Sequence, residues 1–316
     1  MESRVESLVD RMRDRVFAVR RVLQRLEAAM PRVVRVSRAI VYPFALLIVG
    51  YMAYRAIRQT NFSTIHYGPM GAASGLAVVW WISLAAGWAS LVQERAAVVT
   101  WCRTQVARYL PGAIWAFVTR ASTVKGRIRH KLAAVVAENV IVLFASLGVG
   151  GLFAGLADPV WLPLVVLGLV PLVTAGRLAR YTNLTASAVR RTTLIYVVGY
   201  LAYGAFSVLV QWAISGALDR HDALYVAGAS CFAWAAGLVV VFAPGGVGVR
   251  ELSYVWLLAH VLPRDQLQAG AVASRMVTVI AELLVLTIAS RRALEWRRRP
   301  ADGYVDAGDG LERGVQ

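Results

Sequence analysis

Long apolar runs alternate with short polar, arginine-rich segments along most of this 316-residue chain. A helix needs about 20 apolar residues to cross the roughly 30 Å hydrocarbon core of a bilayer. Runs of comparable length predict spans at about 39–57, 71–93, 131–156, 160–177, 192–216, 223–243 and 269–290. A shorter apolar element at about 249–262 is one more candidate. The pattern therefore predicts an all-α fold, a polytopic membrane helix bundle of about eight spans.

Residues 1–38 form a separate amphipathic region. Apolar residues recur there at alternating steps of four and three, and arginines occupy the other faces. This combination is typical of a cytoplasmic helix that lies in the headgroup layer of a membrane. The heptad-like stripe equally suits a short coiled coil, which would join two copies into a homodimer. The chain thus divides into this arm, a transmembrane domain at 39–292, and a basic, then disordered cytoplasmic tail at 293–316.

The distribution of lysine and arginine predicts how the spans are oriented. Cytoplasmic loops carry an excess of these residues, and the arm, the 94–131 loop, the 178–191 loop and the C-terminal segment are rich in them. Both termini are therefore expected in the cytoplasm, which requires an even number of crossings. The 249–262 element would then have to cross, although about 14 helical residues reach only about 21 Å. The element must be extended by the unwound Pro-Gly backbone, cross a locally thinned part of the membrane, or be re-entrant.

Two Pro-Gly segments interrupt the apolar pattern. One reads APGGVGVREL at Ala243–Leu252, and the other reads YLPGAIW at Tyr109–Trp115. Each Pro-Gly lies ten residues after a tryptophan, Trp234 or Trp101. Proline stops a helix, and a broken helix survives at membrane depth only against protein or a water-filled cavity. Two breaks in corresponding places predict an internal pseudo-repeat, whose broken or re-entrant elements meet at a transport site.

The backbone at these breaks is suited to bind an anion. A helix that starts after a break points unpaired N–H groups and a partial positive charge towards it. The residues concerned are Pro111, Gly112, Pro244, Gly245, Gly246 and Gly248. The alternative is that these glycines only allow helices to cross closely. Further glycines are expected to interrupt the span at 131–156, at Gly148, Gly150 and Gly151.

Charged side chains next to the breaks are candidates to contact a lipid headgroup. Arg250 follows the second break directly and is suited to hold a phosphate bidentately. Its neighbour Glu251 would neutralise it or contact a cationic headgroup, and an ordinary ion pair at a helix start is the alternative. Arg108 and Arg120 flank the first break, where they either recruit phosphate or only set the topology.

Charged residues also occur inside the predicted spans. Glu138 lies in the span at 131–156, and Arg275 and Glu282 lie seven residues apart in the last span. Seven residues are two helical turns, so Arg275 and Glu282 share a face. A charge at the centre of a membrane helix costs about 2.5–3.5 kcal/mol. We therefore expect these side chains and Glu251 to face a cavity and one another, either for transport or as pairs that lock the bundle.

The two motifs also carry a family resemblance. APGGVGVREL, together with LPGAIW, resembles the transmembrane flippase region of the lysylphosphatidylglycerol synthase (multiple peptide resistance factor) family, over roughly Arg38 to Arg292. The resemblance extends to stand-alone relatives. It implies that the protein moves an aminoacyl-phosphatidylglycerol or a polyprenyl-phosphate-linked sugar between the leaflets of a bacterial-type cytoplasmic membrane. The soluble aminoacyl-transferase domain of bifunctional members would follow the membrane region, but this chain stops at Gln316. Aminoacyl transfer is therefore not expected, and the polyprenyl-phosphate lipid is favoured.

Composition narrows the classes of partner. Hydrophobic residues make up 58% of the chain, and its net charge of +16 is nearly all arginine in loops. This charge suits an anionic membrane surface and anionic headgroups, not a nucleic acid. Cys102 and Cys231 have no metal-ligand spacing, and neither do the four histidines, so neither a metal nor a cofactor is expected. The ten tryptophans mostly suit the interfacial belts of a membrane protein, although three near the breaks could line a lipid-tail groove, Trp101, Trp115 and Trp234.

The function expected from the sequence is that of a lipid flippase and not of an enzyme. One alternative is a polyprenyl-phosphate-dependent membrane glycosyltransferase, which would need an acidic group on the outer side to deprotonate its acceptor. The outer candidates for that role are Asp158, Asp219 and Asp222. A second alternative is a non-catalytic membrane scaffold that assembles through the arm at 1–38.

Overall fold

The computed structural model describes most of the chain between residues 65 and 298. The described residues are Tyr54, Arg58, 65–94, 97–105, 120–121, 128–182, 184–240, 244–246 and 248–298. Several predicted features lie outside them, namely the arm at 1–38, nearly all of the span at 39–57, Arg108, the break at Pro111-Gly112 and residues 299–316. The described residues thus cover the predicted spans from the second onward.

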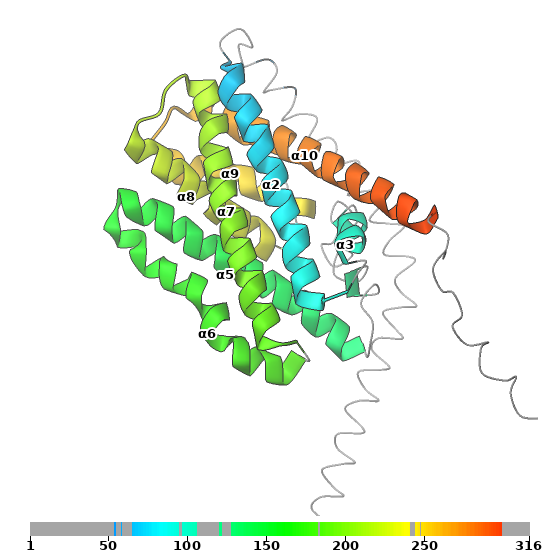
Figure 1. Cartoon of the computed structure of the whole chain (residues 1–316). Coiled ribbons are helices and arrows are strands. Elements are labelled where there is room, and N and C mark those ends of the chain that lie inside the picture. Colours follow the sequence, from blue (N-terminus) through cyan, green and yellow to red (C-terminus); the bar gives the residue numbers. More distant parts are fainter. Residues whose placement is uncertain are drawn as a thin grey trace, which may run out of the picture.

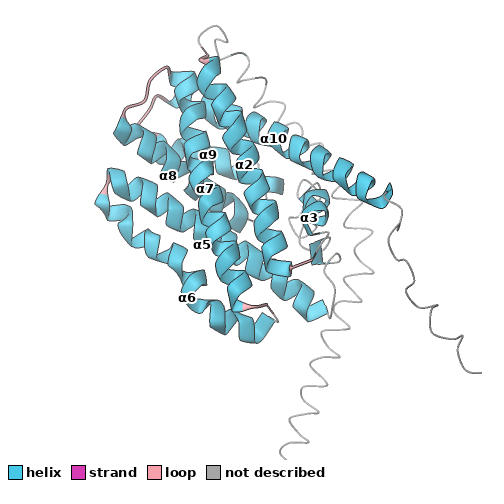
Figure 2. Ribbon diagram, in the orientation of Figure 1, coloured by secondary structure: helices cyan, strands magenta, loops and turns pink. Residues whose placement is uncertain are grey.

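The described secondary structure is helical, as Figure 2 shows. In chain order the elements are α2 (Tyr67–Val92), α3 (Ala97–Gln105), α5 (Ile128–Ala157), η3 (Pro159–Leu164), α6 (Val165–Thr182), α7 (Ala186–Ser215), α8 (Arg220–Val239), η4 (Pro244–Gly246), α9 (Val249–Leu258) and α10 (Arg264–Arg298). Within the described residues, six stretches are long and apolar enough to cross a membrane: α2, α5, η3 with α6, α7, α8 and α10. They confirm the prediction of a multi-pass helical membrane protein.

The helices pack as a bundle with an aromatic interior. Helix α2 runs beside α7, α5 packs against α6, α7 and α8, and α10 crosses α2 and α7 (Figure 1). Fully buried aromatic side chains fill the centre, among them Trp80, Trp81, Trp88, Tyr196 and Phe206. By contrast, α6 and α10 present apolar side chains outward, such as Val173, which is 80% exposed. Outward apolar faces of this kind suit contact with lipid.

Local sequence signals set the ends of the central helices. The Thr185 side chain accepts a hydrogen bond from the Ala188 N–H at 3.1 Å and caps the start of α7. Gly216 ends α7 with a φ of 80°, a left-handed conformation that favours glycine. The Asp219 side chain accepts from the Asp222 N–H at 2.7 Å and caps α8. Helix α7 begins before the apolar run at 192–216 because polar residues continue a helix as well as apolar ones do.

The glycines of α5 do not interrupt it, which corrects the expectation from the sequence. The helix runs unbroken from Ile128 to Ala157. A Cβ atom added at Gly148 would lie 2.5 Å from the Cα atom of Gly168 on α6. A Cβ at Gly150 would lie 2.7 Å from the Phe232 ring of α8, and one at Gly151 would lie 2.6 Å from Leu164. These glycines therefore allow close helix packing, which is the role small residues commonly play in membrane bundles.

Helix α9 is shorter than the element predicted at 249–262. It spans ten residues, Val249–Leu258, which corresponds to about 15 Å of helix. It is not among the six stretches long and apolar enough to cross a membrane. A crossing by α9 alone falls well short of a roughly 30 Å core. The predicted count of about eight spans relied on this element and on the span at 39–57.

Replacing Gly148 by alanine should destabilise the fold. The new Cβ meets backbone at 2.5 Å on α6, so the helices must separate, at a cost of about 1–3 kcal/mol. Thermal unfolding of the purified protein in detergent would measure this loss. Gly176→Ala on α6 is the matched control, because a Cβ there meets nothing within 4 Å. Equal melting temperatures for the two variants would contradict the packing role of Gly148.

Candidate functional site

The second Pro-Gly motif breaks the chain between α8 and α9. Helix α8 ends at Val239, a short 3₁₀ turn covers Pro244–Gly246, and α9 starts at Val249. Three of the motif's glycines have positive φ values, 58° at Gly245, 71° at Gly246 and 83° at Gly248. Residues with a Cβ rarely adopt this conformation. The glycines are thus required by the backbone of the break itself, as the sequence predicts.

Glu251 caps the helix that follows the break. One of its carboxylate oxygens accepts a hydrogen bond from the Gly248 N–H at 2.7 Å. From the sequence, Glu251 is expected to be a partner of Arg250 or of a headgroup, and the structure adds this capping role. A carboxylate at this position also interacts favourably with the partial positive charge of a helix N-terminus. Glu251 therefore occupies part of the anion-attracting site expected there.

Arg250 turns back from α9 onto α8. Its guanidinium carbon lies 3.3 Å from the centroid of the Trp234 ring, within the range of a cation–π interaction. A Cβ atom at Gly237 would lie 2.5 Å from Cγ of Arg250, and one at Gly246 would lie 2.6 Å from its Nε. The two glycines thus provide the space that the arginine side chain occupies.

Arg250 and Glu251 line a pocket between four helices. Helices α7, α8, α9 and α10 contribute its lining, which consists of Tyr203, Ser207, Ser230, Ala233, Trp234, Arg250, Glu251, Tyr254, Ala271, Ser274, Arg275 and Thr278. The cavity has a volume of about 40 Å³, whereas a single water needs at least about 10–15 Å³. Pockets for larger ligands measure about 300–1,000 Å³. In this conformation the pocket therefore holds only a few water-sized groups.

Arg275 brings a second positive charge to this pocket. Its Nη1 atom donates a hydrogen bond to the carbonyl oxygen of Gly245 at 3.3 Å and so ties α10 to the break. The structure thus brings together Arg250, Glu251 and Arg275 beside the broken backbone. Two guanidinium groups face one carboxylate, so these three side chains give the pocket an excess of positive charge.

Glu138 belongs to a different, closed cluster. It forms an ion pair with Arg120 and accepts hydrogen bonds from Trp101 Nε1 at 2.8 Å and from the Tyr196 hydroxyl at 3.5 Å. The Arg120 guanidinium carbon lies 5.5 Å and 5.3 Å from the ring centroids of Trp88 and Trp101. Glu138 is 3% exposed and Arg120 is 7% exposed. The arrangement matches the alternative in which Glu138 forms a structural pair, here joining α3, α5 and α7.

Glu282 does not join Arg275 at the pocket, although the two residues share a face of α10. Arg275 is among the pocket-lining residues described above, and Glu282 is not. Glu282 lies close enough to Cys102 of α3 to affect its thiol. Burial raises the pKa of Cys102 to about 11, the Glu282 carboxylate adds to this rise, and Arg120 opposes it. Glu282 therefore lies towards the cluster of Arg120 and Glu138.

A row of tryptophan rings runs from the Arg120–Glu138 ion pair to Arg250 at the pocket. Ring centroids lie 5.8 Å apart for Trp101 and Trp81, 4.9 Å for Trp81 and Trp80, and 4.5 Å for Trp80 and Trp234. Arg120 faces one end of this row at Trp101, and Arg250 lies on the other end at Trp234. All four rings are buried. The sequence analysis assigned most tryptophans to interfacial belts, and for Trp80 and Trp81 that assignment is wrong, because both lie in the core.

Several polar residues of the pocket were missed by sequence reasoning. Ser207, Ser230, Tyr254, Ser274 and Thr278 line it, yet each is a common residue in apolar helices. The available signal was that Tyr254, Ser274 and Thr278 lie on α9 and α10, the helices that carry Arg250 and Arg275; Ser207 and Ser230 lie on α7 and α8 and had no such signal. That signal is weak, since serine and threonine often bond only to their own helix in membrane proteins.

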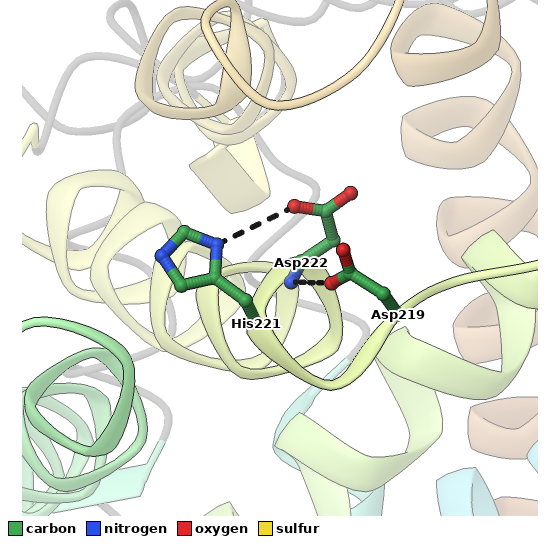
Figure 3. A group of neighbouring side chains, drawn as sticks. All are labelled: Asp219, His221 and Asp222. Atoms are coloured by element: carbon green, nitrogen blue, oxygen red, sulfur yellow. Dashed lines mark hydrogen bonds and ion pairs between the residues drawn. The ribbon is translucent and has the colours of Figure 1, made fainter.

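An exposed group of acidic residues and a histidine lies at the start of α8, shown in Figure 3. Asp219, His221 and Asp222 each offer a ligand atom, and these atoms lie within 4.8 Å of one another. The spacing of the histidines did not predict this proximity. Asp219 is already used as the helix cap, and His221 Nδ1 lies 3.6 Å from Asp222. Both contacts are ordinary for an exposed helix start.

Comparisons with known proteins add no family to this picture. No protein-family model matches the chain, and no curated protein matches it. A functional assignment therefore depends on the geometry of the break and its pocket, together with the resemblance of the two motifs.

The ion pair of Arg120 and Glu138 should be essential for stability. Glu138→Gln removes the carboxylate that pairs with the buried Arg120 guanidinium, and breaking such a buried pair costs about 3–5 kcal/mol. The double variant Arg120→Met with Glu138→Leu removes both charges and should recover most of that loss. Chemical unfolding of the single and double variants in detergent gives the coupling energy. A Glu138→Gln variant as stable as the wild type would contradict this role.

Proposed function

We propose that the protein moves an anionic, phosphate-containing lipid between the two leaflets of its membrane. The observation that carries this proposal is a pocket lined by two arginines inside a bundle that contains apolar, membrane-length helices. A phosphate carries its charge into a layer of low dielectric only if protein groups compensate for lost water. Arginine is the side chain best suited to do so, because its planar fork can hold a phosphate bidentately.

The broken backbone beside the pocket favours transport over a purely structural role. Transporters place discontinuous helices at their substrate sites, where the freed backbone groups contact the substrate. Here the break itself contains three glycines, and the carbonyl oxygen of one of them, Gly245, accepts a hydrogen bond from Arg275. In this proposal Arg250 and Arg275 bind the phosphate, and Glu251 balances the charge of the empty site. Arg120, Glu138 and Glu282 support the bundle at the other end of the tryptophan row.

Helix α9 is the element through which the pocket would open. Its inner face carries Arg250, Glu251 and Tyr254, whereas Leu252 and Trp256 on the outside are 73% and 77% exposed. It is therefore a single layer between the pocket and the surrounding lipid. The pocket of about 40 Å³ must widen to admit a headgroup, and glycines at the start of α9 allow such a movement.

The finer features of the proposal follow the family resemblance. The lipid would be a polyprenyl-phosphate-linked sugar or an aminoacyl-phosphatidylglycerol in a bacterial-type cytoplasmic membrane, with both termini in the cytoplasm. Arg108 and the Pro111-Gly112 break would complete the path from the other half of the pseudo-repeat. A homodimer through the arm at 1–38 remains part of the proposal. In a membrane glycosyltransferase, Asp158, Asp219 or Asp222 would have to serve as the base, but the side chains of Asp158 and Asp219 already cap η3 and α8.

Substitution of the pocket arginines should slow lipid exchange without unfolding the protein. A charged hydrogen bond contributes about 1.5–3 kcal/mol, so Arg250→Ala or Arg275→Ala should slow exchange by about 10- to 100-fold. Leaflet exchange of fluorescent phosphatidylglycerol in proteoliposomes, followed by dithionite quenching, measures the rate. Arg220→Ala is the control, because Arg220 lies exposed at the start of α8.

Two outcomes would count against a flippase. Wild-type exchange rates in both pocket variants, with melting temperatures unchanged, would remove the pocket from the transport path. Transfer of radiolabelled sugar from a polyprenyl-phosphate donor by the purified protein would favour the glycosyltransferase instead.

A further inference from the structure

The side chains that line the pocket carry more positive than negative charge. Among the described residues of this lining, Arg250 and Arg275 are cationic and Glu251 is anionic. The Glu251 carboxylate accepts a hydrogen bond from the Gly248 N–H, which fixes its position at the start of α9. Arg275 is held in turn by its bond to the Gly245 carbonyl. Charges within a bundle of apolar helices require partners of opposite sign, so one further negative charge would balance this site.

The Tyr203 hydroxyl lies near all three of these charged groups. Each of them is close enough to act on this hydroxyl electrostatically. The Tyr203 ring is fixed by aromatic packing, since its centroid lies 4.6 Å from that of Trp80 and 5.6 Å from that of Trp234. The same Trp234 ring carries the Arg250 guanidinium on its face. The hydroxyl is therefore held in a defined place beside the positive charges.

Two hydroxyl hydrogens of the pocket are available to an anion. Six of the described residues that line the cavity have hydroxyl groups. Four of these hydroxyls donate to protein oxygens, namely those of Ser207, Ser230, Tyr254 and Thr278. Within the described part of the chain, no hydrogen bond occupies the hydroxyl of Tyr203 or of Ser274. Each can donate its single hydrogen to an ion in the cavity, and Ser274 directly precedes Arg275 on α10.

The size of the cavity limits which anion it can hold. Its volume is about 40 Å³, and one water needs at least about 10–15 Å³. A chloride ion is only slightly larger than a water molecule, whereas a phosphate joined to a lipid is much larger. We propose that the pocket in this conformation binds one chloride ion between Arg250 and Arg275, with the hydroxyls of Tyr203 and Ser274 as further ligands. The ion would neutralise the charge that Glu251 leaves unbalanced.

Chloride binding goes beyond the proposed function and does not depend on it. It needs only the charges and hydroxyls of the pocket at its present size, and no movement of α9 or of a lipid. Chloride presents no hydrogen and accepts bonds from any direction, so it suits donors that come from three different helices, α7, α9 and α10. The protein would therefore hold this ion whether or not it transports lipid.

Equilibrium dialysis of the purified full-length protein against radioactive chloride tests the inference. The protein is kept in a non-ionic detergent with excess sodium gluconate, which screens the exposed arginines but is too large for the cavity. Chloride should bind saturably, at one ion per chain. Bromide should displace it, whereas sulfate, which is larger, should not. Binding that does not saturate, or that sulfate displaces as well as bromide does, would overturn the inference.

Variants of the proposed ligands locate the ion. Arg250→Ala or Arg275→Ala should weaken chloride binding about 10- to 100-fold, because each removes a charged hydrogen-bond donor. Tyr203→Phe keeps the packed ring but removes the hydroxyl, and should weaken binding about 2- to 10-fold. Arg220→Ala and Tyr225→Phe are the matched controls, because neither residue lines the pocket. If the arginine variants do not fold, Tyr203→Phe decides alone, and wild-type affinity in the folded pocket variants would refute the site.

Lipid exchange in proteoliposomes separates this inference from the proposed function. Exchange that depends on Arg250 and Arg275, together with no saturable chloride binding, would refute the chloride site and leave the flippase standing. Saturable chloride binding that depends on the same two arginines, together with no lipid exchange, would refute the flippase and leave the chloride site standing.

Discussion

The cost of burying charge among apolar helices is the constraint on which the described structure depends. An isolated charge in such an interior is prohibitively expensive, so each buried charge must be paired or bonded. Glu138 meets this demand with Arg120, Trp101 and Tyr196, and in doing so joins three helices. Arg275 is half-buried and donates a hydrogen bond to the Gly245 carbonyl, which joins α10 to the break. The contacts that stabilise these charges are therefore also contacts that hold the helices together.

Around these charges, glycines allow close approach of helices and tryptophans fill the remaining space. Glycines allow α5 and α6 to approach and leave the room that Arg250 occupies between α8 and the break. Tryptophans fill the space between the two charged groups, from Trp101 to Trp234. Aromatic rings suit both ends of this row, since their faces attract the guanidinium groups and their edges pack tightly. The outcome is one closed cluster and one cluster that borders a cavity.

The two clusters of charged residues differ in whether they border a cavity, and this difference makes the second break the candidate site. Around Glu138, an ion pair and two hydrogen bonds surround the carboxylate. At the other end, Arg250 and Arg275 border a small cavity that Glu251 and several serine, threonine and tyrosine side chains also line. A site that binds and releases a charged headgroup needs both charge and accessible space. Among the described residues, those two features coincide at the break between α8 and α9.

The sequence by itself determined the membrane class, the helical composition and the position of the second break, because apolar run length, proline and glycine act locally on the backbone. Only the tertiary structure decided which charged residues meet. Arg275 and Glu282 share a helix face, yet one borders the pocket and the other lies towards Cys102. The glycines of α5 allow packing instead of interrupting the helix, and Trp80 and Trp81 lie in the core. The physical reason is that these roles depend on neighbours supplied by helices distant in sequence, which local periodicity does not encode.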